Sequence, residues 1–164
     1  MRTYKFKMYP TSQEKENLFV TLNNCRFTYN KLLEYLNKQE KVDRGDVQHH
    51  IVDLKQEFKF LKNTYSKTLQ YEHYRLFSSM KGLSKSKKNG NKIGRLRFKS
   101  RNRYTSFTYN QSGFKIIQTD KRYNKLHLSK IGDIRFKQSR DIEGKIKQVQ
   151  VKLKPSGWYC YIIT

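Results

Sequence analysis

Acidic residues are scarce in this chain, and one long internal stretch has none. The 164 residues include 13 Asp and Glu against 36 Lys and Arg, which gives a formal net charge of +23 at pH 7. No acid occurs between Glu72 and Asp120. A charge of this size predicts a polyanionic partner, with nucleic acid as the first candidate and an anionic membrane surface as the second.

Cysteines and long apolar runs are also scarce. Cys25 and Cys160 are the two cysteines, and because they are far apart and outside any CxxC pair, we expect buried apolar side chains rather than a disulfide framework or a zinc site. No run approaches the roughly 20 apolar residues of a membrane-spanning helix, and the N-terminus lacks the apolar stretch of a signal peptide. These absences favour a cytoplasmic protein with no membrane partner. The length of 164 residues fits one modest domain, or two small lobes sharing a core.

Motifs for catalysis and metal binding are lacking as well. The sequence contains no G-x-S-x-G, HExxH or P-loop motif. Its acids are scattered, so they do not indicate the converging carboxylates of two-metal nuclease chemistry. The adjacent His49 and His50 would face different directions on a helix, with no further ligand nearby. We therefore expect no catalytic residue, no metal site and no cofactor in this chain.

The first half of the sequence shows helical periodicity after one short strand. Residues 3–8 alternate like a strand, and Thr11 with Glu14 fits a capping box that begins a helix. Breaks at residues 23–24, 43–46 and 63–66 divide residues 11–83 into four helices. The first two could form a helix-turn-helix, although a plain structural pair fits the same pattern.

Period-two alternation dominates the second half. The alternating segments are Leu96/Phe98, Phe107/Tyr109, Leu126/Leu128, Ile134/Phe136, 146–153 and 158–164, and turn residues separate them. This spacing predicts a small barrel or strongly curved sheet, which the first strand would join. Residues 81–94 are expected to be a mobile basic loop. The fold class is therefore α+β: a β-barrel interrupted after its first strand by a four-helix insert.

The acid-free stretch has a composition suited to nucleic acid. On a strand, Arg95, Arg97 and Lys99 would share one face about 6–7 Å apart, comparable with the spacing of phosphates along a nucleic-acid strand. Residues 104–111 add hydrogen-bonding and stacking groups that can contact bases. A solvated strand whose charges only keep the chain soluble is the alternative. Similarly, the polar face of the helix that starts near Ser66 could contact bases or only water.

Five segments stand out in order along the chain: YKFKMYPTSQEKENLFVTLNNCRFTYNKLLEY, TLQYEHYRLFSSMKG, KIGRLRFKSRNRYTSFTYNQ, LHLSKIGDIRF and GKIKQVQVKLKPSGWYCYIIT. In this order they resemble the TnpB (OrfB) family of transposon-encoded RNA-guided DNA nucleases. The resemblance covers essentially the whole chain. It implies a wedge domain with an OB-like β-barrel, built from residues 1–10 and 84–164. It also implies that residues 11–83 are a helical recognition insert with a helix-turn-helix-like start.

The resemblance also implies partners and site residues. Such domains bind the guide (omega) RNA and read a short motif beside the target in double-stranded DNA. Matching positions imply motif-reading roles for His50, Ser66, Lys67, Gln70, Thr108, Tyr109 and Asn110. Contacts to the RNA or DNA backbone are expected from Arg75, Lys81, Lys85, Lys87, Lys88, Lys92, Arg95, Arg97, Lys99, Arg101, Arg103 and Tyr104.

One departure from the family decides what activity to expect. The family continues with a RuvC nuclease domain, to which Mg would belong, and a zinc ribbon; neither has a counterpart here. The resemblance thus implies a nucleic-acid-binding module of the prokaryotic cytoplasm, associated with the nucleoid and not catalytic alone. We expect a truncated product, a fragment, or half of a split nuclease completed by a RuvC-containing chain. An RNA-independent helix-turn-helix regulator and a remnant that binds any polyanion are the alternatives.

Overall fold

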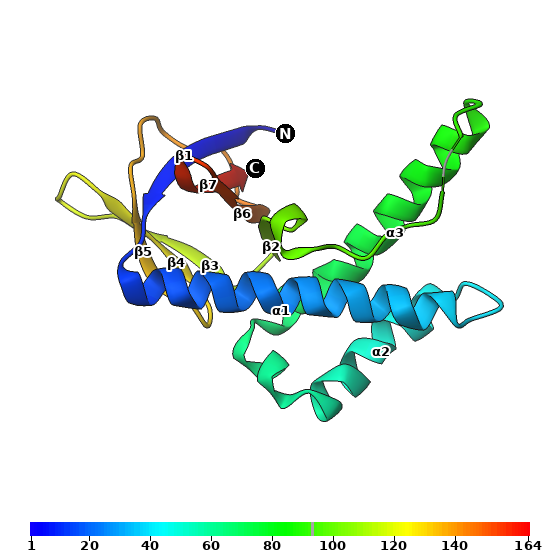
Figure 1. The fold of residues 1–164 in the computed structure, drawn as a ribbon. Coiled ribbons are helices and arrows are strands. Elements are labelled where there is room, and N and C mark those ends of the chain that lie inside the picture. Colours follow the sequence, from blue (N-terminus) through cyan, green and yellow to red (C-terminus); the bar gives the residue numbers. More distant parts are fainter. Residues whose placement is uncertain (93) are drawn as a thin grey trace.

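The computed structural model describes residues 1–92 and 94–164, and it confirms an α+β fold (Figure 1). The helices in these residues are α1 (Ser12–Asn37), α2 (Arg44–Glu57) and α3 (Ser66–Lys88), with 3-10 helices η1 (Lys59–Asn63) and η2 (Arg101–Arg103). The strands are β1 (Thr3–Tyr9), β2 (Ser106–Asn110), β3 (Phe114–Ile117), β4 (Asn124–Leu128), β5 (Gly132–Phe136), β6 (Gln148–Lys154) and β7 (Gly157–Ile163). All three α-helices lie between β1 and β2 in the chain.

The strands form one antiparallel sheet in the order β2-β6-β7-β1-β5-β4-β3. Strand β1 lies in the middle and changes partner along its length. Residues Thr3 to Lys7 pair with β7, whereas Met8 and Tyr9 pair with β5. The edge strands β2 and β3 share no ladder in the described part of the chain. The sheet is therefore open, and the expected closed OB-like barrel is not found.

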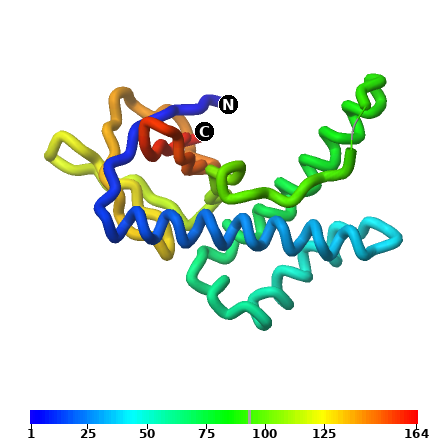
Figure 2. The backbone as a smooth tube through the Cα atoms, in the orientation of Figure 1, coloured from blue at the N-terminus to red at the C-terminus, as the bar shows by residue number. Residues whose placement is uncertain are grey.

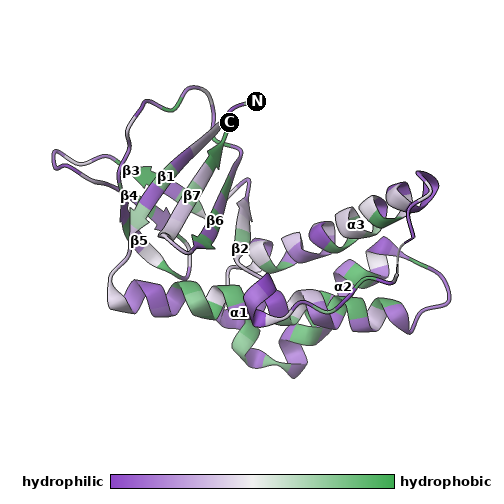
Figure 3. Cartoon of the chain, turned by 45° about the horizontal axis from the view of Figure 1, so that its top comes forward, coloured by the Kyte–Doolittle hydropathy of each residue, from purple (hydrophilic) through white to green (hydrophobic). Residues whose placement is uncertain are grey.

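The alternation of each strand places one face of the sheet in the core. Tyr4, Phe6 and Met8 are buried while the residues between them are exposed. Strands β6 and β7 add Val149, Val151, Cys160 and Ile162, all of them fully buried. Cys25 and Cys160 are free and buried, which confirms the expectation drawn from their spacing. Figure 3 shows the same alternation as hydrophobic and hydrophilic bands along the elements.

Helix α1 is continuous where the sequence predicted two helices. Its capping box is confirmed, because Thr11 Oγ1 accepts from the Glu14 N–H at 3.2 Å. The break expected at residues 23–24 was wrong. The buried Asn24 directs its amide to Thr64 Oγ1 at 3.0 Å, across to another segment, instead of competing for the helix's own backbone. The helix therefore runs for 26 residues, about 39 Å.

Two further boundaries differ from expectation. Asp43, expected in a turn, is the N-cap of α2 and accepts from the Gly45 N–H at 2.8 Å. Residues 81–88 of the expected mobile loop form the last two turns of α3. There the positive charges of Lys85, Lys87 and Lys88 interact favourably with the negative end of the helix dipole and so stabilise the helix. Ile93 of that loop lies outside the described residues. With only three α-helices in the described chain, the four-helix insert is not found either.

The helices extend away from the sheet. In Figure 1, α1 runs beneath the sheet with α2 on its other side, and the outer end of α3 rises away from both helices. Figure 2 shows the two chain termini side by side, where Thr164 N–H donates to the Arg2 carbonyl at 3.0 Å. No helix among the described residues has the length and apolarity needed to cross a membrane.

Tyr65, immediately before α3, packs the start of this helix against the sheet. Its ring stacks on Tyr109 with centroids 5.4 Å apart, and its hydroxyl lies 2.8 Å from Ser112 Oγ. Gly113 has a φ of 86°, and a Cβ there would lie 2.5 Å from the Tyr65 ring. Gly113 thus meets two constraints, a left-handed backbone and contact with an aromatic ring.

We expect Gly113→Ala to destabilise the fold more than Gly90→Ala does. Both glycines have a φ near 85°, but a Cβ at Gly90 meets nothing within 4 Å. The control therefore reports only the backbone cost of about 1–2 kcal/mol, and the ring contact adds about 1–3 kcal/mol at Gly113. Urea unfolding of the two variants measures the difference. Equal losses would show that Tyr65 moves aside freely.

Candidate nucleic-acid interface

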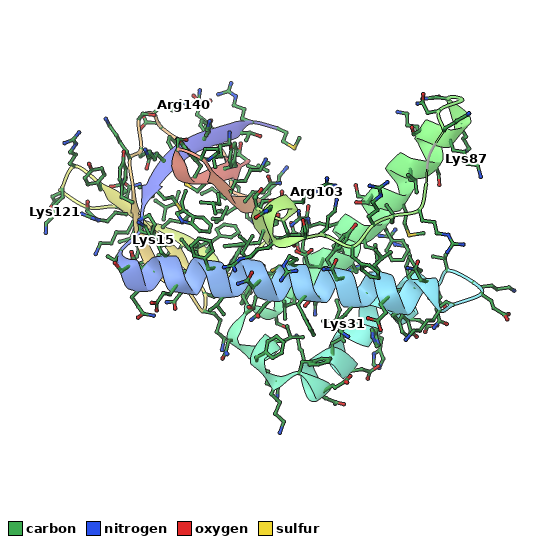
Figure 4. All side chains as sticks on the ribbon, in the orientation of Figure 1. Lys15, Lys31, Lys87, Arg103, Lys121 and Arg140 are labelled. Carbon is green, nitrogen blue, oxygen red and sulfur yellow. The ribbon has the colours of Figure 1, made fainter. Side chains whose placement is uncertain are left out.

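The exposed cations gather on a projecting part of the chain that we call the basic arm, residues 81–92 and 94–103. It consists of the outer half of α3 and the segment that returns from it to the sheet. Its cations are Lys81, Lys85, Lys87, Lys88, Lys92, Arg95, Arg97, Lys99, Arg101 and Arg103, all exposed except the half-buried Lys99. None of them forms an ion pair within the described residues, and the arm holds no acid. Figure 4 shows Lys87 near the outer end of α3 and Arg103 near the sheet.

The returning segment is attached to α1 by a side chain and not by a partner strand. Asn30 Oδ1 accepts from the Lys99 N–H at 2.8 Å, and Asn30 Nδ2 donates to the Lys99 carbonyl at 3.0 Å. These two bonds satisfy the backbone groups that a strand neighbour would otherwise satisfy. The strand expected at Leu96 and Phe98 is therefore absent, and Phe98 is 56% exposed.

Apolar side chains beneath the arm set its position. Leu33 and Leu36 of α1, with Met80 and Leu83 of α3, line a cavity of about 520 Å³ that Leu96 also lines. Lys87 and Arg95 stand at the same cavity. The arm thus has an apolar underside and a cationic exposed side, as expected for a segment that packs loosely on the protein and contacts an anion.

Arg75 is half-buried and Tyr104 is buried, and contacts within the protein occupy both side chains. Arg75 Nη1 donates to Tyr104 Oη at 2.8 Å and to the Ser106 carbonyl at 2.7 Å, and its guanidinium covers the Tyr104 ring. Tyr104 is 3% exposed, and its hydroxyl donates to Glu72 Oε1. These contacts join α3 to the start of β2, so the two residues hold the base of the arm in place.

Glu72 is the acid of this buried cluster. Burial raises the pKa of Glu72 to about 7, and this effect outweighs the opposing attraction of Arg75, whose Nη1 is 3.5 Å from Glu72 Oε1. Glu72 Oε2 has no hydrogen-bond partner among the described residues, and neither have the buried hydroxyls of Thr28 and Thr68. The site therefore accommodates a protonated carboxyl more readily than a charged one.

A second surface, rich in polar and aromatic groups, forms where α3 meets the sheet. We call it the polar–aromatic surface. Its members are Ser66, Lys67, Gln70, Tyr71 and Tyr74 of α3, Asn110 of β2, and Gln148 and Gln150 of β6. The α3 members recur at helical spacing on one face. Gln148 Nε2 joins the elements, because it donates to Tyr71 Oη at 3.3 Å and to Asn110 Oδ1 at 3.2 Å.

Four of the expected motif-reading residues lie on this surface. Lys67 is exposed, and the half-buried Gln70 side chain makes no hydrogen bond within the described chain, so its amide is available. Ser66 accepts from Lys55 Nζ at 2.6 Å. Asn110 is held by Gln148, as described above. These residues can offer both donors and acceptors to base edges.

The other three expected motif-reading residues lie elsewhere. Thr108 and Tyr109 are buried, and Tyr109 Oη donates to the Ser129 carbonyl at 2.6 Å, so both support the sheet. His50 lies on α2, where its ring stacks on Tyr35 at 4.1 Å. No three His, Cys, Asp or Glu side chains group as metal ligands in residues 1–92 and 94–164.

Sequence reasoning missed Tyr71, Tyr74, Gln148 and Gln150. The two tyrosines follow Lys67 and Gln70 by four residues, so helical spacing alone could have placed them on the same face. The two glutamines required knowledge that β6 pairs with β2, with Gln148 opposite Asn110. No local pattern carries that information.

Glu72→Gln should remove a pH dependence from the stability of the fold. As pH rises, the unfolded state loses the Glu72 proton near pH 4.5, whereas the folded state keeps it until near pH 7. The free energy of unfolding therefore falls as pH rises through this interval. At ~1.4 kcal/mol per pKa unit the loss is on the order of 3 kcal/mol. Urea unfolding of both proteins at about pH 5 and about pH 8 should show the variant gaining relative stability at the higher pH.

Glu34→Gln is the matched control for this prediction. Lys31 lowers the pKa of the partly exposed Glu34, so its contribution to stability is lost as pH falls below the interval tested, and the sign is opposite to that of Glu72. If wild type and Glu72→Gln respond to pH in parallel, Glu72 does not titrate in this interval.

Two comparisons with known proteins bear on these surfaces. Residues 1–42 match the family model HTH_OrfB_IS605, described as a helix-turn-helix domain. Over 173 aligned residues the whole chain is 27% identical to a protein of Escherichia coli (strain K12) named putative RNA-guided DNA endonuclease InsQ. The chain spans 40% of the length of that relative. The two findings bear out the resemblance to the TnpB (OrfB) family, and the match to that family's helix-turn-helix model covers residues 1–42.

Proposed function

We propose that this chain binds the guide RNA of an RNA-guided DNA-targeting protein and recognises a short motif in the double-stranded target. The observation that carries the proposal is the basic arm, which presents ten cations and no acid on a projecting segment fixed at its base. Phosphate contacts of this kind supply affinity without selecting a sequence. The relative's name, an RNA-guided DNA endonuclease, supports RNA and DNA as the two partners.

Motif recognition is assigned to the polar–aromatic surface. Its free amide at Gln70 and the cation at Lys67 can pair with adenine and guanine edges in a major groove. It lies on the inner half of the helix whose outer half belongs to the basic arm. A nucleic acid gripped by the arm would therefore run along α3 toward the surface that reads it.

Catalysis is not assigned to this chain. Its described residues hold no group of metal-ligating side chains, and the proposal gives cleavage to a RuvC nuclease elsewhere, supplied by another chain or segment. Adding a RuvC-containing partner together with Mg²⁺ tests this point. Cleavage by the 164-residue chain alone would contradict it.

An RNA-independent helix-turn-helix regulator is the second candidate. The description of the matching family model favours it. Within residues 12–37, however, the chain forms a single helix and not two helices joined by a turn. The first candidate therefore remains the better supported one.

Sequencing of the RNA retained after a high-salt wash separates the two candidates. The protein would be expressed with its native flanking DNA. One dominant structured transcript is the expected result, and Lys87→Gln combined with Arg95→Gln should reduce its recovery. Bulk cellular RNA, or none, together with sequence-selective binding of duplex DNA, would favour the regulator. Binding without sequence preference would indicate a general polyanion binder.

Variants of the two surfaces should behave differently on duplex DNA. Gln70→Ala should relax the preference at one base pair by about 1–3 kcal/mol. Arg97→Ala should weaken binding to all sequences and reduce the salt slope by about 1. Competition binding with a randomised motif measures both effects, with Lys62→Ala in η1 as an exposed cation outside the arm. If the first two variants behave alike, the division into reading and gripping surfaces is wrong.

A further inference from the structure

The outward face of the central strands carries a second cationic surface, remote in sequence from the basic arm. Strands β1, β6 and β7 contain no Asp or Glu. Among their outward positions are four lysines and two tyrosines, which we call the Lys–Tyr face: Lys5, Lys7, Lys152, Lys154, Tyr159 and Tyr161. None of these residues is buried, whereas their neighbours along each strand pack into the core.

Strand register brings these six side chains together. Lys5 lies opposite Tyr161, while Lys7 and Lys152 both lie opposite Tyr159, one from each neighbouring strand. The Lys5 ammonium is 4.8 Å from the centre of the Tyr159 ring, and the Lys152 ammonium is 4.7 Å from that of Tyr161. Lys154 is 5.7 Å from both rings.

This arrangement concentrates positive charge without neutralising it. None of the four lysines forms an ion pair in the described chain. Ring faces attract the ammonium groups only modestly in water, whereas the mutual repulsion of four cations on the two strands that flank β7 favours a bound anion. The charge of this face therefore complements a polyanion.

The rings specify which polyanion fits. An aromatic ring on a sheet can stack an unpaired base, while flanking lysines turn from the ring to the phosphates. In a duplex the bases already stack on each other, so two rings on a flat face gain nothing from it. Ser156 Oγ, 2.7 Å from Tyr159 Oη, adds a group that can bond to a ribose 2′-hydroxyl.

We infer that the Lys–Tyr face binds a single-stranded segment of RNA, with bases on Tyr159 and Tyr161 and phosphates on the four lysines. The inference rests on the proposed function, because the guide RNA is the partner that would supply the unpaired segment. It adds a binding surface on the sheet, whereas the basic arm is built from the end of α3 and the segment that follows it. RNA held at both places would span the fold from the sheet to the end of α3.

Fluorescence anisotropy with a labelled oligouridine of about 12 nucleotides tests the inference on the 164-residue chain. Tyr159→Leu and Tyr161→Leu keep apolar bulk but remove the stacking ring, so each should weaken binding about tenfold with an unchanged salt slope. Lys5→Gln and Lys154→Gln should each lower the salt slope by about 0.7. Tyr35→Leu, a half-buried tyrosine of α1, and Lys62→Gln are the matched controls and should leave binding unchanged.

The outcomes separate this inference from the proposed function. If the basic-arm variants weaken RNA binding and the tyrosine variants do not, the Lys–Tyr face is not a binding surface, although the proposed function stands. If oligothymidine DNA binds as tightly as the RNA, the choice of RNA is wrong. If neither oligouridine nor the retained transcript binds, both proposals fail. Photo-crosslinking gives a direct readout. The RNA should crosslink to peptides that contain Tyr159 or Tyr161.

Discussion

The hydrogen bonds that Arg75 donates to Tyr104 and to the Ser106 carbonyl determine where the cationic segment can lie. They join α3 to the first residues of β2, so the chain between them must leave the core along one helix and return beside it. The Arg75 guanidinium can occupy this half-buried position because it contacts Glu72 Oε1 and the face of the Tyr104 ring. Glu72 thus contributes to the packing at the base of the arm, and the arm itself carries only positive charges.

The aromatic residues divide between interior packing and the surfaces proposed to bind nucleic acid. Tyr104 and Tyr109 are buried, and the half-buried Tyr65 has its ring stacked on Tyr109, so these three connect elements of the fold. Tyr71 and Tyr74 of the polar–aromatic surface, and Tyr159 and Tyr161 of the Lys–Tyr face, remain at least partly exposed beside amides or lysines. Burial thus separates the two groups of aromatic residues, which composition alone cannot do.

Local signals in the sequence predicted the elements well and their connections poorly. The capping box at Thr11, the alternation of β1 and the apolar positions of β4 to β7 depend on neighbours in the chain, and all were confirmed. Two errors, the helix break at Asn24 and the strand at Phe98, have a common origin. Each segment is fixed by a distant partner: Asn24 by Thr64, and the residue next to Phe98, Lys99, by Asn30. The burial of Tyr104 against Glu72 likewise depends on a distant contact. Tertiary contacts of this kind override the pattern around a residue, and no single-sequence argument contains them.

The pairing of the two chain termini has a mechanical consequence. Because β1 and β7 are antiparallel, Thr3 pairs with Ile163 at the same end of the sheet at which Thr164 meets Arg2. A tension applied between the termini would load these hydrogen bonds one after another, as in a zipper, and not all at once in shear. The pairing of β1 with β7, at the centre of the sheet, is therefore the part that resists such a force least. This holds even though β1 is the strand that joins the two halves of the sheet.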